Sequence, residues 1–305
     1  MNHAYPRDLI GYGNTPPDPQ WPGQARIAVS FVLNYEEGGE RCILHGDNES
    51  EAFLSEIPGA VPFPEARHMS MESVYEYGSR AGVWRILKLF AKHKIPLTVF
   101  AVAMAAQRYP EVIQTMHQAG HEICSHAYRW IDYQKLSKEE EQEHLYKAIN
   151  ILQDITGQRP LGWYTGRNSP NTRDIVMQEG GFLYDSDAYD DDLPYWVNNQ
   201  GKGHLVIPYT LDSNDMRFAT QQGFNSGEQF FQYLKDSFDS LYEEGAEAPK
   251  MLSIGLHCRL IGRPGRIAAL RRFIEYAQSH EQVWFARRVD IARHWHVTHP
   301  FQANT

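Results

Sequence analysis

Short apolar runs alternate along most of this chain with longer segments of helical periodicity. The run Ile27–Tyr35 is almost continuously apolar and rich in β-branched and aromatic residues, as is typical of a buried parallel strand. Seven shorter runs of the same kind follow, at 97–102, 121–125, 161–165, 182–185, 205–209, 251–256 and 283–286. Such an alternation is typical of a parallel sheet or barrel. We therefore predict an α/β fold, a single irregular (β/α) barrel with seven or eight parallel strands.

Helix start and stop signals lie between these runs. Ser137 and Glu140 form a capping-box pattern, and Gly157 ends the helix that they begin. Ser226 and Gln229 repeat the pattern before another helical segment. The predicted helices are 82–93, 111–119, 137–156, 171–179, 226–244, 265–279 and 288–295.

One barrel accounts for nearly all of the 305 residues. We predict an N-terminal arm at 1–25, a catalytic barrel at 26–296 and a C-terminal tail at 297–305. A proline-rich insertion at 42–79 follows the first strand, and the segment 187–203 interrupts the alternation again. Long loops at the carboxyl ends of strands hold the active sites of barrel enzymes. We expect the arm and the insertion to cover such a site or to form an interface.

Charge and cysteine content restrict the partners and the compartment. Lys and Arg total 29 against 38 Asp and Glu, a balance that argues against binding to nucleic acid or to an anionic membrane. No apolar stretch approaches the roughly 18 residues of a membrane span, and the first residues do not resemble a signal peptide. Cys42, Cys124 and Cys258 are odd in number and far apart. We expect a cytoplasmic protein that binds neither nucleic acid nor a membrane.

Four polar clusters stand where predicted strands end. They occupy 34–39, 120–130, 164–170 and 256–259. Each has an ordinary interpretation by itself, because Glu36 and Glu37 could form a solvated turn, His126 a core histidine and Arg167 a surface ion pair. In a barrel, however, all four strand ends meet at one mouth. Their joint occurrence therefore predicts an active site there.

In this order the clusters resemble the motifs of the polysaccharide deacetylase (NodB-homology) superfamily. NYEEG at 34–38 takes the place of that family's Thr-Phe-Asp-Asp-Gly, and GHEICSH at 120–126 matches its Gly-His-Glu-Ile-x-x-His. RNSP at 167–170 resembles Arg-x-Pro with one extra residue, and Leu256-His257 resembles Leu-x-His imperfectly. The resemblance covers about 26–290. It implies the (β/α) barrel of the deacetylases.

The departures from these motifs concern the metal site. In the deacetylases, the second Asp of the first motif and two histidines four residues apart bind a divalent metal. This chain has Glu37 at the Asp position and Trp130 four residues after His126. An indole cannot bind such an ion. We therefore expect no metal and no other cofactor, although a weak site at Glu37 and His126 remains an alternative.

With these departures, the sequence is similar to the cofactor-independent allantoinases, which belong to the same superfamily. The shared stretches are 34–39, 125–130, 162–167, 184–187 and 190–196. The resemblance implies hydrolytic opening of the hydantoin ring of allantoin to give allantoate, in purine catabolism. It also implies a homotetramer. The ring nitrogen of a hydantoin is imide-like and a better leaving group than an ordinary amide, which fits a site without a metal.

The resemblance also assigns roles. Glu36, in the place of the family's base, would take a proton from water, and His257, in the place of its acid, would protonate the leaving nitrogen. His126 would share or orient these protons. Burial and the neighbouring Glu37 are expected to raise the pKa of Glu36 toward neutrality. The remaining predicted substrate contacts, among which the donor to the oxyanion stays open, are Glu37, Trp130, Tyr164, Arg167, Asp185 and Arg259.

Two other functions compete with this one. The first is a metal-dependent deacetylase of an N-acetylated carbohydrate, and the second is an inactive carbohydrate-binding relative. The missing metal ligands and signal peptide argue against the first. The presence of acid, base and donors together argues against the second. Cys124 and Cys258 adjoin apolar runs and are interpreted as inert packing residues, and the acidic stretch 190–192 as a solvated loop.

Overall fold

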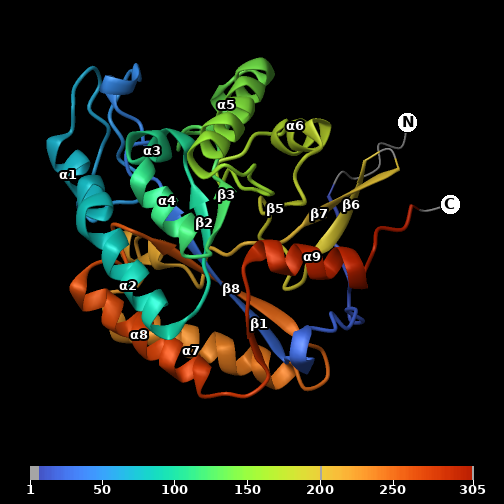
Figure 1. The fold of residues 1–305 in the computed structure, drawn as a ribbon. Coiled ribbons are helices and arrows are strands. Elements are labelled where there is room, and N and C mark those ends of the chain that lie inside the picture. Colours follow the sequence, from blue (N-terminus) through green and yellow to red (C-terminus); the bar gives the residue numbers. More distant parts are fainter. Residues whose placement is uncertain (1–6, 200, 304–305) are drawn as a thin grey trace.

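Within residues 7–199 and 201–303, which the computed structural model describes, nine strands form one curled sheet (Figure 1). Its order is β6-β7-β5-β4-β3-β2-β1-β8, and β9 pairs with β1. All pairings are parallel except the β6–β7 hairpin. The strands are β1 (Ile27–Tyr35), β2 (Thr98–Ala101), β3 (Glu122–Ser125), β4 (Gly162–Trp163), β5 (Tyr184–Asp185), β6 (Tyr195–Asn199), β7 (Lys202–Val206), β8 (Lys250–His257) and β9 (Val283–Phe285).

Helices cover the outside of this sheet, with α7 and α8 packed together beside β8 and with α3 and α4 against α5 (Figure 1). They are α1 (Met69–Tyr77), α2 (Val83–His93), α3 (Ala103–Arg108), α4 (Pro110–Gln118), α5 (Lys138–Thr156), α6 (Thr172–Glu179), α7 (Gly227–Glu244), α8 (Pro264–Gln278) and α9 (Arg288–Thr298). A π-helical turn, η3 (Gly78–Gly82), joins α1 to α2, and 3-10 turns occur at η1 (Pro22–Gln24), η2 (Ile43–His45), η4 (Tyr133–Lys135) and η5 (Asp215–Ala219).

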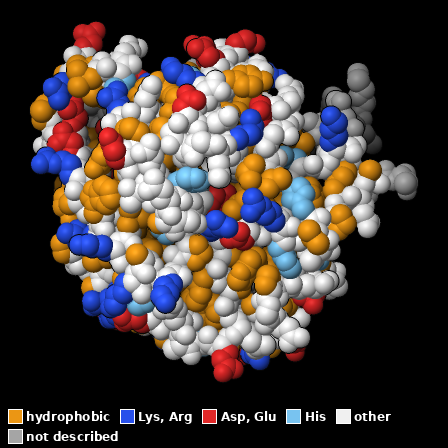
Figure 2. Space-filling model, in the orientation of Figure 1, with side chains coloured by type: hydrophobic (Ala, Val, Ile, Leu, Met, Phe, Trp, Pro, Cys, Tyr) orange, Lys and Arg blue, Asp and Glu red, His pale blue; other side chains and the backbone are white. Residues whose placement is uncertain are grey.

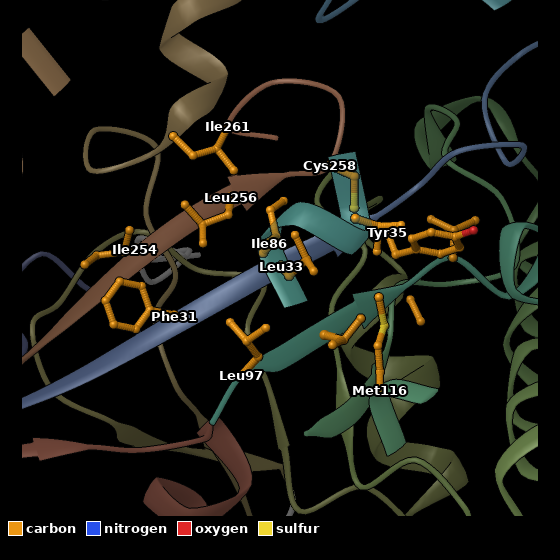
Figure 3. Close-up of a cluster of buried hydrophobic side chains, with 14 of the residues drawn as sticks. Phe31, Leu33, Tyr35, Ile86, Leu97, Met116, Ile254, Leu256, Cys258 and Ile261 are labelled. Atoms are coloured by element: carbon orange, nitrogen blue, oxygen red, sulfur yellow. The ribbon is translucent and has the colours of Figure 1, made fainter. Parts of the chain in front are cut away.

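Both faces of β1 are buried, which explains its continuous apolar character. Phe31 and Leu33 pack outward among the helices, beside Ile86 of α2 and Leu256 of β8 (Figure 3). Val32 points to the opposite face and joins the cluster inside the barrel. A strand covered on both sides needs no polar alternation. β1 also pairs with β8 over eight residues in parallel register, which brings the carboxyl ends of these two strands side by side.

The barrel is irregular because β8 and β7 do not pair as strands. The segment before η5 fills this gap, where the backbone N–H of Gly255 donates to the carbonyl of Ser213 (3.0 Å). The Ser213 hydroxyl donates to the carbonyl of Ser253 (2.7 Å). Inside the barrel, the Arg288 guanidinium spans the same gap, from the Ser253 hydroxyl (2.9 Å) to the carbonyl of Pro208 (2.6 Å). Side chains and a loop thus complete the closure that strand pairing leaves open.

The predicted α/β barrel is confirmed, and all eight predicted strands are present. The hairpin strand β6 lies in a stretch interpreted as loop, and α1, η3 and α3 were not predicted because they are short or follow the proline-rich insertion. The capping box of Ser137 and Glu140 is present. At α7 only half of the pattern forms, since the Gln229 side chain accepts from the N–H of Asn225 rather than that of Ser226. The domain boundaries stay predictions.

The surface carries mixed charge. On the face shown in Figure 2, basic, acidic and apolar side chains are interspersed. Among the described residues, no helix is both long enough and apolar enough to cross a bilayer.

Candidate active site

Four polar side chains meet at the carboxyl ends of β1, β3 and β8, which belong to the run of strands β3-β2-β1-β8. Glu36 directly follows β1, His126 follows β3, and His257 ends β8, where it lies beside Asn34 in the strand register. All are nearly inaccessible, with exposures of 1% for Glu36, 1% for His126 and 4% for His257. Arg259, two residues beyond β8, is fully buried. The parallel register of β1, β2, β3 and β8 therefore delivers these groups to one point, as predicted for a barrel mouth.

The Glu36 carboxylate is the centre of this arrangement. One oxygen, Oε1, lies 3.4 Å from Nε2 of His126 and 3.6 Å from Nε2 of His257. The other, Oε2, lies 2.7 Å from Nη1 of Arg259. The same nitrogen is 3.7 Å from Oε1 of Glu37. Two imidazoles and one guanidinium thus surround a single carboxylate, and the second carboxylate shares its cation.

Asp215, which the sequence interpretation missed, holds His257 in place. Its Oδ1 lies 2.6 Å from Nδ1 of His257, and its Oδ2 accepts from the backbone N–H groups of His257 (2.8 Å) and Ile261 (2.9 Å). Asp215 is fully buried at the start of η5. A carboxylate at Nδ1 directs the opposite ring nitrogen, Nε2, toward Glu36 and the reacting atoms. No motif marks Asp215 in the sequence, because a loop brings it here from the gap beside β8.

The predicted rise in the pKa of Glu36 is wrong. Burial by itself would raise the pKa, but the charges of Arg259, His257 and His126 outweigh it and hold the pKa of Glu36 well below its usual range. The pKa of the neighbouring Glu37 is raised instead. Burial, reinforced by Glu36 and only partly opposed by Arg259, raises the pKa of Glu37 to about 7. Arg259 lies closer to Glu36, and this asymmetry separates the two carboxylates.

The residues present do not fit the divalent metal that deacetylase motifs bind. A guanidinium, which is itself cationic, contacts both Glu36 and Glu37. Trp130, at the position of the second histidine, is 5% exposed and packs with its ring 5.4 Å from the guanidinium of Arg259. In residues 7–199 and 201–303, no three His, Cys, Asp or Glu side chains are grouped as a metal site. Arg259 supplies the positive charge at this point.

Several buried polar atoms of this cluster lack a well-oriented hydrogen bond within the described chain. Buried polar groups almost always find partners, so a cluster of unsatisfied ones indicates that a ligand or water belongs there. Their mixture of acceptors and donors fits a small polar molecule with both carbonyl and N–H groups. Apart from Oε2 of Glu36 and Nη1 of Arg259, which form an ion pair with each other, the atoms are Oε1 of Glu37, Oη of Tyr75, Nδ1 of His126 and Nη2 of Arg259.

The insertion at 42–79 covers this cluster. The carbonyl of Leu54 accepts from Nε of Arg259 (3.3 Å), and Leu54 has a φ of 54°, in the left-handed region. The ring of Phe53 stacks on that of Trp130 at 5.8 Å. The N-terminal arm lies elsewhere, since its Trp21 donates to the carbonyl of Lys250 at the amino end of β8. The insertion therefore contributes to the site, whereas Trp21 packs at the other end of the barrel.

The other predicted contacts fall in different places. Tyr164 lies in the cluster, with its ring 4.9 Å from that of His126. Arg167 lies over the ring of Trp130 at 4.8 Å and 3.7 Å from Glu51 of the insertion. The Asp185 carboxylate is engaged away from the cluster, by Nε of Arg173 (2.9 Å) and Nε2 of His204 (3.0 Å). The structure thus gathers Glu36, Glu37, His126, Trp130, Tyr164, His257 and Arg259, and leaves Arg167 and Asp185 in supporting positions.

Two further groups bear on the sequence interpretation. Asp187 accepts from the backbone N–H groups of Thr165 (3.0 Å) and Gly166 (2.8 Å), and burial together with Asp185 raises the pKa of Asp187 to about 7. The thiols of Cys124 and Cys258 are fully buried, and burial raises the pKa of each well above its usual value. They remain protonated at neutral pH, as packing residues do.

Comparison with known proteins agrees with this architecture. The model of the family described as polysaccharide deacetylase matches residues 66–180. A curated protein of Schizosaccharomyces pombe, named "Putative polysaccharide deacetylase", is 47% identical and covers 97% of this chain and 99% of its own length.

Two solved structures are more similar still. The crystal structure of a "probable Polysaccharide deacetylase" from Pseudomonas aeruginosa PAO1 is 75% identical, with a TM-score of 0.96, and covers 98% of this chain and 100% of that one. The crystal structure named "Puue Allantoinase" is 74% identical, with a TM-score of 0.97 and the same coverage. From its barrel, its site and these full-length similarities, the chain belongs to the polysaccharide deacetylase family of hydrolases.

Proposed function

We propose that this protein is an allantoinase, which opens the hydantoin ring of allantoin by hydrolysis and uses no metal ion. The observation that carries the proposal is the guanidinium of Arg259, which lies 2.7 Å from Glu36 and 3.7 Å from Glu37 at the point where deacetylase motifs place a metal. The 74% identity to a protein named Puue Allantoinase supports the choice of substrate.

A guanidinium can replace part of what a metal does. A metal polarises the carbonyl and lowers the pKa of the attacking water, whereas a buried guanidinium polarises the carbonyl alone. The hydantoin ring offsets the difference, because its imide-like nitrogen leaves more readily than an ordinary amide nitrogen. An N-acetyl sugar offers no such help. The site is therefore better suited to opening an activated ring than to removing an acetyl group.

The proposed first step is attack of water on a ring carbonyl. Glu36 takes the proton of this water, and His126, 3.4 Å away, orients the carboxylate. In the free protein, the charge of Arg259 makes Glu36 a weak base. As Arg259 turns its hydrogen bonds to the developing oxyanion, its hold on Glu36 weakens and the pKa of Glu36 rises. Arg259 thereby couples substrate binding to activation of the base.

The second step is departure of the ring nitrogen. His257 delivers a proton to this nitrogen from Nε2, which faces Glu36 at 3.6 Å. Asp215 fixes the imidazole through Nδ1 and stabilises its charged form. Trp130 and Tyr164 border the reacting groups with flat aromatic surfaces, and the donor and acceptor atoms left unsatisfied nearby are available to the carbonyl and N–H groups of the substrate.

The test is loss of allantoin with purified full-length protein after exhaustive chelation, with the metal content measured on the same sample. We expect turnover to continue at a metal content far below one ion per chain, and no acetate release from N-acetylated chito-oligosaccharides. Turnover that appears only after a divalent ion is restored would overturn the metal-free part of the proposal. Acetate release without allantoin loss would overturn the choice of substrate.

A further inference from the structure

The π-helical turn η3 lies directly against the candidate site. Here the N–H of Val83 donates to the carbonyl of Gly78, five residues earlier, so that the turn holds one more residue than an α-helical turn. Such π-turns are rare and occur frequently at functional sites. The Glu37 carboxylate, just after β1, and the Cys258–Arg259 backbone, just after β8, are neighbours of this turn.

The glycines of η3 leave no room for side chains. A Cβ atom at Gly78 would lie 2.2 Å from Oε1 of Glu37 and 2.9 Å from the backbone nitrogen of Arg259. A Cβ atom at Gly82 would lie 2.0 Å from the carbonyl oxygen of Cys258. Real Cβ contacts are essentially never shorter than 3.0 Å. The backbone of η3 therefore packs so closely against Glu37 and Cys258 that a side chain at position 78 or 82 would clash with them.

The same segment also supports the cation of the site. Tyr75, in the last turn of α1, is 1% exposed and presents its ring face 4.2 Å from the guanidinium of Arg259. A guanidinium stacked on a buried aromatic ring is held in a defined plane. Tyr75 and Gly78 are three residues apart in one helical segment, where such neighbours share a face. This face contacts both members of the Glu37–Arg259 pair.

The two glycines differ in what they contact. Gly82 faces backbone, at Cys258 and at Gly262, and so it serves packing. Gly78 faces mainly the end of a carboxylate side chain, which can move, and has a single backbone neighbour, the nitrogen of Arg259 at 2.9 Å. A methyl group at 78 would have to displace the Glu37 carboxylate, at 2.2 Å, much further than the Arg259 backbone nitrogen, at 2.9 Å. Because Glu37 and Glu36 share Arg259, such a shift changes the electrostatic balance of both carboxylates.

We propose that Gly78 is a positioning residue for Glu37: its missing side chain leaves the space that the Glu37 carboxylate occupies, and so sets the distance between Glu37 and Arg259. The π-turn places this glycine backbone at the site. The activity readout rests on the proposed function, since it measures allantoin turnover.

The first experiment compares Gly78→Ala with Gly265→Ala in the full-length protein. Gly265 is the matched control because a Cβ atom there meets nothing within 4 Å. We expect Gly78→Ala to lower kcat by about 10- to 100-fold, with a much smaller change in KM, because misplacement of about 1 Å has effects of this size. The control should retain wild-type kcat. A Gly78→Ala protein with wild-type kcat, measured per folded molecule, would overturn the proposal.

The second experiment adds Glu37→Asp, which shortens the side chain by one methylene and makes room for a methyl group at 78. We expect Gly78→Ala to lower kcat less in the Glu37→Asp background than in the wild type. The urea midpoints of the four proteins should also be non-additive. Additive midpoints would contradict the proposed contact. The midpoints need no substrate, so they still decide the role of Gly78 if the wild type fails to hydrolyse allantoin and the proposed function falls.

Discussion

Two buried Arg–Glu clusters lie inside this barrel, and they differ in how completely their polar atoms are satisfied. At the candidate site, Arg259 faces Glu36 and Glu37, and several atoms lack well-oriented partners. We call this the upper cluster. The lower cluster is built around Arg288, which donates to the hydroxyls of Ser186 (2.9 Å) and Ser253 (2.9 Å) and to two carbonyl groups, those of residues 207 and 208.

Glu122 completes the lower cluster. It accepts from the hydroxyls of Thr98 (2.8 Å) and Tyr184 (2.8 Å) and from the N–H of Val289 (2.9 Å). Every side-chain nitrogen of Arg288 and both oxygens of Glu122 therefore have partners. A fully satisfied buried network fixes a structure, whereas a network with free donors and acceptors can receive a ligand. The comparison assigns stability to the lower cluster and chemistry to the upper one.

The strongest test of this comparison is Arg259→Met. We expect kcat for allantoin to fall by about 1,000-fold or more, because the variant loses the donor to the oxyanion in a buried site. Arg259→Lys should recover only part of the activity, since an ammonium lacks the planar group that stacks on Tyr75 and donates through Nε to the carbonyl of Leu54. Kinetics per folded molecule measures the effect. An Arg259→Met protein within tenfold of wild type would remove Arg259 from the reaction.

Asp215→Asn tests the upper cluster one step away from the substrate. The amide cannot hold the same imidazole tautomer or stabilise its charge, and we expect kcat to fall by about 100- to 1,000-fold while KM changes little. The pH dependence of kcat should change with it, because Asp215 contacts the ring that donates the proton. A rise in KM with unchanged kcat would instead mean that Asp215 only shapes the binding site.

Arg288→Met applies the same substitution to the lower cluster. Here we expect a loss of about 3–5 kcal/mol in the free energy of unfolding, because two buried carbonyl groups and two buried hydroxyl groups lose their donor. The kcat of the folded fraction should stay within about threefold of wild type. Urea unfolding and kinetics on the same preparation measure both quantities. A large loss of kcat without a loss of stability would contradict the division of roles between the clusters.

Sequence patterns predicted which strand ends form the upper cluster, but they did not predict the contacts within that cluster. Strand periodicity placed Glu36, His126 and His257 at the carboxyl ends of predicted strands, because parallel strands repeat a local pattern that can be read directly. Asp215 escaped this reasoning, since a loop that fills the gap beside β8 carries it. The pKa of Glu36 was predicted in the wrong direction for the same reason. Its sign depends on whether Arg259 lies nearer to Glu36 or to Glu37, and sequence spacing does not give that distance.

The segments missed in the sequence are those whose form depends on distant contacts. The π-turn η3 packs against Glu37 and Cys258, which are far from it along the chain. The strand β6 is defined by its hairpin with β7 rather than by apolar alternation. Capping signals at Ser137 are local, and they were predicted correctly. Local rules therefore gave the barrel and the strand ends, and tertiary contacts gave the charge balance.

The smallest predicted effect concerns pH and again separates the two carboxylates of the upper cluster. The pKa of Glu37 is raised from 4.5 to about 7, so the folded protein holds this proton more tightly than the unfolded chain does. Its contribution, on the order of 3 kcal/mol, is complete below about pH 4.5 and is lost as pH rises through about 7. Glu36 has the opposite sign, because its lowered pKa adds stability above about pH 4.5 that is lost in acid.

Glu37→Gln should therefore flatten the decline of the urea midpoint between about pH 4.5 and 7. Asp187, whose pKa is also raised to about 7, should contribute to the slope that remains, and Asp187→Asn is the matched control. A Glu37→Gln protein with the wild-type slope would show that Arg259 is shared differently, with Glu37 ionised as fully as Glu36.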